Sequence, residues 1–147
     1  RLRIHSRMPI AIPQRTTSQL IEILQRSRLA VWLVIHSNHV AELDDLVWRN
    51  LDSWLDAGIP VLNQAVLLAG VNDNVDALEA LCRECVDHRV MPYYLHQLDR
   101  VQGASHFEVP VDRGMSMVDE LRLRLPGYAV PQYVVEQAGE ASKTPIQ

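Results

Sequence analysis

The chain has 147 residues, 48% of them hydrophobic, and a formal net charge of −4 at pH 7. This size and composition predict one domain with a packed core. The mild acidity and the lack of a Lys/Arg run argue against a nucleic-acid-binding surface, and no apolar stretch approaches the length of a membrane span.

The start of the chain and its cysteines add two expectations. The first residue is Arg1 rather than methionine, and an apolar alternating segment follows almost at once. We therefore expect a chain cut from a longer protein, and the start lacks the pattern of a signal peptide. The two cysteines, Cys82 and Cys85, give no disulfide framework and fit a reducing cytoplasm.

Four strand-like apolar segments recur along the chain. They begin near Leu2, Ala30, Pro60 and Val90, and a spacing of about thirty residues matches a strand–helix–strand unit. The second and third segments are almost continuously apolar. Strands buried on both faces have this composition, so a parallel sheet is predicted.

Helical patterns fill the intervals between these strands. Thr16 and Gln19 form a capping box that predicts a helix start. Apolar residues recur at helical spacing over residues 40–54 and again over residues 75–86. A last helix is predicted to start at a cap formed by Asp112.

The strand–helix alternation leaves two architectures, an open doubly wound sheet or a β/α barrel. Polar residues led by His5, His36 and His96 each fall where a predicted strand ends. An open sheet normally places its ligand crevice at one switch point, whereas barrels gather active-site residues at the ends of successive strands. The recurrence favours a barrel, or part of one.

Two polar positions interrupt or end apolar strands. His36 closes an apolar strand, where a histidine is either structural or ligand-binding. Asn63 and Gln64 interrupt the third strand, and two buried amides need hydrogen-bond partners. One of the two is predicted to point into the mouth of the barrel, and a structural amide pair remains the alternative.

A Cys-x-x-Cys motif lies inside the third helical pattern. Cys82 and Cys85 are followed at helical spacing by His88, which suggests a zinc or redox site. Both cysteines lie on the apolar stripe of the predicted helix, which favours packed thiols. One such pair also lacks the further ligands that a closed zinc site needs.

Five blocks of the chain, in order and with matching spacing, resemble successive segments of the lysine 2,3-aminomutase family. The similarity covers nearly the whole chain. It is closest to the branch that makes β-lysine for modifying elongation factor P. The blocks are residues 35–39, 62–73, 106–107, 127–136 and 143–145.

This resemblance implies an α/β fold, part of a (β/α) partial barrel of radical S-adenosylmethionine type, made of its C-terminal βα units. Residues 1–136 would form the C-terminal part of that barrel. Residues 137–147 would be a C-terminal tail that carries the pyridoxal phosphate lysine. An open fragment of this kind exposes a strand edge, so we expect poor solubility or pairing through that edge.

The resemblance also implies roles for five residues. Lys143 would carry pyridoxal phosphate, because a lysine amine can hold an aldehyde covalently, whereas a lysine in a polar tail is otherwise a solvated charge. His36 and Gln64 would line the S-adenosylmethionine site. Asp99 and Glu136, by themselves ordinary surface carboxylates, would grip the distal ammonium of the substrate lysine through charge-assisted hydrogen bonds.

The implied activity is that of an L-lysine 2,3-aminomutase, which converts L-α-lysine to (R)-β-lysine by a radical 1,2-shift of an amino group. Pyridoxal phosphate, S-adenosylmethionine and a [4Fe-4S] cluster would perform the hard steps. The three cysteines that hold the cluster would lie upstream of Arg1, so this chain alone is expected to be inactive. The product would serve elongation factor P and its lysyl ligase in the cytoplasm.

Several positions differ from the free-lysine enzymes of that family. Glu136 stands where they have an aspartate, and its extra methylene would shift or narrow the pocket. His96 replaces a tyrosine near the cofactor, and Asn74 replaces a zinc-binding cysteine. Residues 137–142 replace a glycine-rich loop. These differences favour the elongation factor P branch and argue against structural zinc.

Three other interpretations stay open. The chain could come from a catabolic lysine 2,3-aminomutase that acts on free lysine. It could also be a non-catalytic β/α module that binds a small anion through the polar groups at its strand ends. The third interpretation is a metal site made by Cys82, Cys85 and His88.

Overall fold

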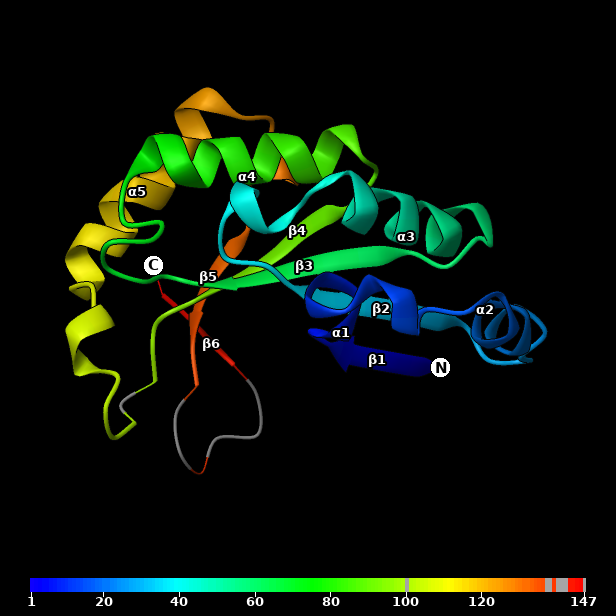
Figure 1. The fold of residues 1–147 in the computed structure, drawn as a ribbon. Coiled ribbons are helices and arrows are strands. Elements are labelled where there is room, and N and C mark those ends of the chain that lie inside the picture. The colour runs from blue at the N-terminus through cyan, green and yellow to red at the C-terminus, as the bar shows by residue number, and fades with distance from the viewer. Residues whose placement is uncertain (100, 137–138, 140–142, 147) are drawn as a thin grey trace.

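The computed structural model describes residues 1–99, 101–136, 139 and 143–146, which form one sheet and its covering helices (Figure 1). The strands are β1 (Leu2–Ser6), β2 (Val31–His36), β3 (Val61–Val66), β4 (Met91–His96), β5 (Gln132–Val135) and β6 (Thr144–Pro145). The α-helices are α1 (Met8–Ala11), α2 (Ser18–Gln25), α3 (Asp45–Asp56), α4 (Val75–Asp87) and α5 (Val111–Arg124). Short 3₁₀ helices are η1 (Pro13–Arg15), η2 (Val40–Glu42), η3 (Ser105–Phe107) and η4 (Gly127–Ala129).

Strand order in the sheet follows chain order, β1-β2-β3-β4-β5-β6. The first five strands are parallel, and a helix-containing segment joins each to the next. Strand β6 runs antiparallel to β5. Parallel strands in sequential order, joined by helices, form the wall of a β/α barrel. The predicted α/β fold and its four main strands are therefore confirmed.

The two faces of the sheet differ in what covers them. Leu33, Ile35 and Leu95 lie on one face and share a hydrophobic core with helix residues such as Leu51. Figure 1 shows α3 and α4 on one side of β3 and β4. The other face holds polar side chains, among them His36 and Gln64 on neighbouring strands. In the described ranges, none of the helices combines the length and apolarity needed to cross a bilayer.

Strand β2 shows why an apolar sequence becomes the middle of this sheet. Leu33, Val34 and Ile35 have no exposed surface. Full burial of one such side chain contributes about 1.5–3 kcal/mol, and the branched residues at positions 34 and 35 suit the extended backbone. The strand therefore anchors both faces of the sheet at once.

Helix α2 starts one residue later than the sequence predicts. The predicted cap was Thr16, whereas the structure uses Thr17, whose extended backbone leads into Ser18. The hydroxyl oxygen of Thr17 accepts a hydrogen bond from the backbone N–H of Leu20 at 3.2 Å. Two adjacent threonines offer the same chemistry, and the chain direction set by η1 decides between them.

Two further helix starts differ from the prediction. The stripe over residues 40–54 predicts one helix, but η2 and α3 divide it, because Asp44 accepts from two backbone N–H groups and starts α3 at Asp45. The N-cap of α5 is Pro110, and Asp112 lies in the first turn instead of capping it. There its carboxylate is near the positive end of the helix dipole.

The end of the chain adds a strand to the sheet. Residues 144 and 145 pair with Val135 and Val134 as β6, and the backbone N–H of Ile146 donates to Tyr133 O at 2.9 Å. The predicted tail over residues 137–147 therefore includes a strand that belongs to the sheet. Most of the 137–142 segment, apart from Gly139, lies outside the described residues.

Candidate active site

Polar side chains gather at the carboxyl ends of the parallel strands. His36 and His96 are the last residues of β2 and β4, and Glu136 directly follows β5. Gln64 lies opposite His36 in the β2–β3 register, and a register shift between β3 and β4 places Tyr94 opposite Gln64. Paired residues of neighbouring strands share a face, so these side chains belong to the face that the helix-side core does not occupy.

Lys143 lies at this edge through its position in the tail. Its Nζ is 2.9 Å from His96 Nε2 and 3.2 Å from Glu136 Oε1, and it lies 4.8 Å from the centre of the Tyr94 ring. The β5–β6 pairing explains the contact with Glu136, because Val135 pairs with Thr144 and the next position outward brings Glu136 opposite Lys143. Lys143 is also the single lysine of the chain.

His36 and Gln64 form a second pair on the same face. The two side chains meet at 3.0 Å between Gln64 Nε2 and His36 Nε2. The other amide atom, Gln64 Oε1, is buried without a hydrogen-bond partner in the described part of the chain. The ring of His5 stands edge-on to His36 with centroids 6.5 Å apart. An acceptor left without a donor is costly in a folded protein, about 1–3 kcal/mol.

The three histidines share one electrostatic environment. Burial lowers the pKa of each of His5, His36 and His96, and the charge of Lys143 lowers all three further. Neighbouring Arg3 adds to the lowering at His5. The site therefore holds neutral imidazoles around one ammonium at neutral pH.

The pKa of His96 indicates that the two candidate carboxylates lie nearby. Burial and Lys143 lower the pKa of His96, whereas the charges of Glu136 and Asp99 raise it. Both carboxylates therefore lie near this ring, at the same edge of the sheet. Asp99 is exposed, three positions beyond the end of β4.

An asparagine network fixes the loops behind these residues. Asn63 Oδ1 accepts from Ser37 N at 2.9 Å, and Asn63 Nδ2 donates to Ser37 O at 3.1 Å. Fully buried Asn72 donates through Nδ2 to Asn38 O and to Val66 O, at 2.8 and 2.9 Å. Of the amide pair in β3, Asn63 is thus structural and Gln64 faces the site. Asn72 lies in a loop and has no local sequence pattern that predicts its burial.

A second set of hydrogen bonds holds Gln97, the residue that follows β4. The hydroxyl of Tyr133 donates to Gln97 Oε1, and Gln97 Nε2 donates to Val109 O at 2.9 Å. Burial raises the pKa of Tyr133 to about 12, so its hydroxyl remains a donor at neutral pH. This chain of contacts ties the residue after His96 to the start of α5.

The cysteines lie in the helix-side core. Cys82 and Cys85 are buried, and burial raises the pKa of both thiols, that of Cys82 to about 12. His88 instead stacks on Trp48, with ring centroids 3.9 Å apart. The prediction of packed thiols is confirmed.

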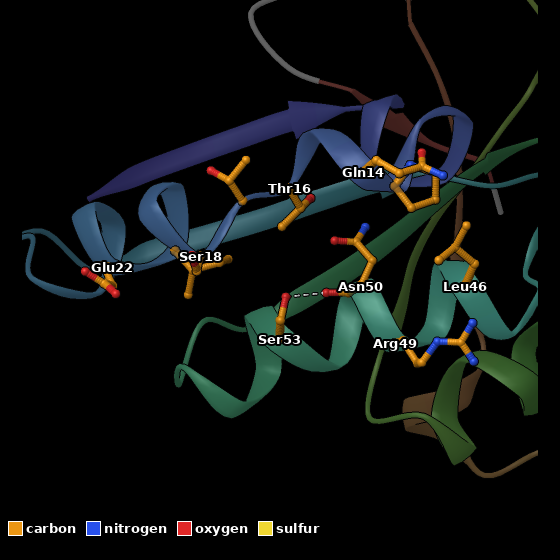
Figure 2. Close-up of a pocket in the computed structure, with 11 residues that line it drawn as sticks. Gln14, Thr16, Ser18, Glu22, Leu46, Arg49, Asn50 and Ser53 are labelled. Atoms are coloured by element: carbon orange, nitrogen blue, oxygen red, sulfur yellow. Dashed lines mark hydrogen bonds between the residues drawn. The ribbon is translucent and has the colours of Figure 1, made fainter.

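A groove on the helix side of the molecule lies apart from the predicted site. It has a volume of about 440 Å³ and lies between the η1–α2 segment and α3 (Figure 2). Figure 2 shows Asn50 and Ser53 of α3 facing Thr16 and Ser18. None of the five residues predicted from the resemblance lines this groove.

Solved structures define the class of the fold. A radical SAM methyltransferase from Sphaerobacter thermophilus superposes with a TM-score of 0.60 at 19% identity, covering 92% of this chain and 40% of that chain. A domain of pyruvate-formate lyase-activating enzyme from Bacteroides vulgatus gives a TM-score of 0.58 at 10% identity, covering 92% and 80%. The fold of this chain is therefore similar to that of the radical SAM methyltransferase and of the activating-enzyme domain.

Curated relatives resemble this chain more closely in sequence than these solved structures do. The chain is 47% identical over 146 residues to L-lysine 2,3-aminomutase of Escherichia coli (strain K12), covering 99% of this chain and 43% of that protein. Proteins of the same name from Acetoanaerobium sticklandii and Haemophilus influenzae are 42% and 41% identical, with 35% and 43% of their lengths covered.

These matches confirm the resemblance inferred from the sequence. The chain is similar along its whole length to the C-terminal part of proteins named L-lysine 2,3-aminomutase, and it spans less than half the length of these three relatives. No protein-family model matches.

The structure brings four of the five predicted residues into two contacts. Lys143 meets Glu136, and His36 meets Gln64, while Asp99 acts on the site through its charge on His96. His96 contacts Lys143 but had no predicted role. Its place at a strand end, and the tyrosine that it replaces in the resembling family, are the signals that pointed to it.

Proposed function

We propose that the protein containing this chain is an L-lysine 2,3-aminomutase that converts L-α-lysine to (R)-β-lysine. The observation that carries the proposal is the single lysine of the chain, held at the strand ends by His96 and Glu136. The similarity of 40–47% to proteins of that name supports it.

The residues around Lys143 fit pyridoxal phosphate. The side chain of Lys143 is one-quarter exposed, so its amine is open to an incoming aldehyde, and the ring of Tyr94 below it offers a flat surface for a pyridine ring. When bound, pyridoxal phosphate supplies a π-system that stabilises the migrating nitrogen. Lys143 would hold the group, and Tyr94 and His96 would orient that lysine.

His36 and Gln64 fit S-adenosylmethionine. The unused buried oxygen of the Gln64 amide can accept from a hydroxyl or amino group of such a ligand. The neutral imidazole of His36 accepts from Gln64 through Nε2, which leaves its Nδ1–H to donate to the ligand. When bound, S-adenosylmethionine with a [4Fe-4S] cluster supplies the radical that removes hydrogen from lysine. We propose that cysteines outside this chain hold the cluster, because Cys82 and Cys85 are buried in the core.

Asp99 and Glu136 are proposed to bind the distal ammonium of the substrate. The charges of both carboxylates raise the pKa of His96, which supports a position for both close to this ring. The Glu136 side chain is 54% exposed, so its pairing with Lys143 is partly solvated and open to exchange with a second cation. Two carboxylates on one ammonium would hold the substrate still, which is a proximity effect.

We further propose that the β-lysine serves elongation factor P and its lysyl ligase. The support is the set of departures from the free-lysine enzymes, above all Glu136, His96 and Asn74. The structure gives Asn74 another task, because its Oδ1 accepts from Ala77 N at 2.9 Å and caps α4. Deleting the gene in its host should abolish β-lysylation of elongation factor P. A catabolic enzyme would leave that modification intact.

Reduction with borohydride tests the cofactor site. The complete protein is loaded with pyridoxal phosphate, reduced, digested and mapped, and the label is expected on Lys143. Because this is the chain's single lysine, a labelled lysine within these 147 residues is unambiguous. Lys143→Arg should take up no label there. A label elsewhere in wild type would refute the proposal, and no label would favour a binding module.

A further inference from the structure

Among the described residues, Lys143 has polar contacts with His96 and Glu136, which differ in environment. Its Nζ is 2.9 Å from His96 Nε2 and 3.2 Å from Glu136 Oε1. His96 is 9% exposed, whereas the Glu136 side chain is 54% exposed. The imidazole is therefore the contact that fixes the amine in one place, because a buried partner keeps its position better than a solvated one.

The geometry defines the protonation of the pair. An ammonium has donors only, so a protonated Lys143 requires His96 Nε2 to be the acceptor. The ring then carries its proton on Nδ1. The groups that face His96 are Lys143, Glu136, Asp99 and His36, and the ring of Tyr94 lies 5.7 Å away. Burial and the nearby ammonium keep this imidazole neutral by lowering its pKa.

We propose that His96 holds Lys143 at the strand ends and receives the proton that the ammonium must lose before it can attack a carbonyl carbon. This role rests on the proposed function of Lys143 as the cofactor lysine. It assigns a catalytic group that the sequence analysis left without a role.

The proton step balances within the pair. The Nζ–H bond of the ammonium breaks and a new N–H bond forms at His96 Nε2, which leaves a neutral amine with a free electron pair. His96 becomes an imidazolium, and the charges of Glu136 and Asp99 favour that form. When the amine is released again, the proton returns along the same contact. Glu136 also touches Nζ, but its side chain is 54% exposed, so the buried imidazole is the partner that keeps its position against the amine.

The first test observes the hydrogen bond in cofactor-free protein. Histidine ring nitrogens are labelled with ¹⁵N in the complete protein, and the His96 signal is assigned by its loss in His96→Gln. We expect the tautomer with the proton on Nδ1. Lys143→Met should raise the pH at which His96 titrates, because it removes a nearby positive charge. An Nε2–H tautomer, or a titration that does not respond to Lys143→Met, would overturn the proposal.

The second test measures the capture of pyridoxal phosphate by absorbance at several pH values. Because general acid–base groups contribute about 100-fold or more, His96→Gln is expected to slow capture by about that factor. Its rate should also lose the inflection that tracks His96 titration. The matched control His88→Gln removes an imidazole from the end of α4 and should stay within twofold of wild type. Equal rates in His96→Gln and wild type would refute the role.

The two tests separate this proposal from the proposed function. Borohydride labelling of Lys143 with an unresponsive His96 would refute the role of His96 alone. If Lys143 takes up no label, the proposed function fails, and the tautomer of His96 still shows whether the hydrogen bond exists.

Discussion

For Gly114→Ala, helix propensity predicts a gain in the free energy of unfolding, whereas packing predicts a loss. Gly114 lies inside α5, where alanine is ordinarily more favourable than glycine by about 1 kcal/mol. A Cβ added at this position would lie 2.6 Å from Cζ and 2.8 Å from Cε1 of Tyr133. The side chain of Tyr133 is 2% exposed and donates to Gln97, so moving the ring breaks a buried hydrogen bond.

The magnitude follows from these two costs. Overpacking a core costs about 1–3 kcal/mol, and a buried polar group left unsatisfied costs about 1–3 kcal/mol. After the gain in helix propensity, we expect Gly114→Ala to lower the free energy of unfolding by about 3 kcal/mol.

Urea unfolding of the complete protein measures this change as a lower midpoint at unchanged slope. Gly127→Ala is the control, because its added Cβ meets nothing within 4 Å, and it should change stability by less than about 0.5 kcal/mol. Adding Tyr133→Phe to Gly114→Ala should recover part of the loss by removing the hydroxyl. A Gly114→Ala protein as stable as wild type would refute the packing argument.

Four further outcomes are expected. Asn63→Ala leaves the buried N–H of Ser37 without its acceptor and should cost about 1–3 kcal/mol in urea unfolding; unchanged stability would contradict this. Asp99→Asn and Glu136→Gln should each weaken L-lysine binding tenfold or more, because a charged hydrogen bond contributes about 1.5–3 kcal/mol. Unaltered affinity in calorimetry would exclude the binding of the substrate ammonium by these two carboxylates. The folded-state pKa of His5, His36 and His96 is below 6.5, so the unfolded chain binds more protons than the folded protein at low pH. The free energy of unfolding should therefore fall as the pH drops through 6.5, and above about pH 7 these groups should not affect it. The fall should be smaller in His96→Gln. Cys82 and Cys85 should react with a thiol reagent only after unfolding, and rapid reaction of native protein would contradict their burial.

The sheet was predictable because buried parallel strands have a composition that few other elements share. Strand β2 is apolar on both faces, and its prediction is accurate to within a residue or so of the observed bounds. Helix starts were less predictable, because Thr16 and Thr17 are chemically equivalent caps and only the preceding backbone selects one. Strand β6 was missed since it has two residues, one of them Pro145, and depends wholly on pairing with β5.

The candidate site, too, was only partly predictable from the sequence. Alternation along β3 shows from the sequence that Asn63 and Gln64 face opposite sides, but only the structure shows which one the helices cover. The contact between Lys143 and His96 joins residues 47 positions apart. It depends on the tail folding back along β5, and no local pattern in the tail specifies that.

The two edge strands of the sheet, β1 and β6, differ in their ability to pair with a further strand. Strand β6 carries Pro145, which has no backbone N–H, so this margin is poorly suited to accept another strand. In the described residues, β1 pairs on one side with β2, and its outward amides and carbonyls are those of an ordinary strand. Extension of the β-structure is therefore directional. Additional strands, whether from the same polypeptide or from another molecule, would join beside Ile4 and leave the lysine-bearing margin unchanged.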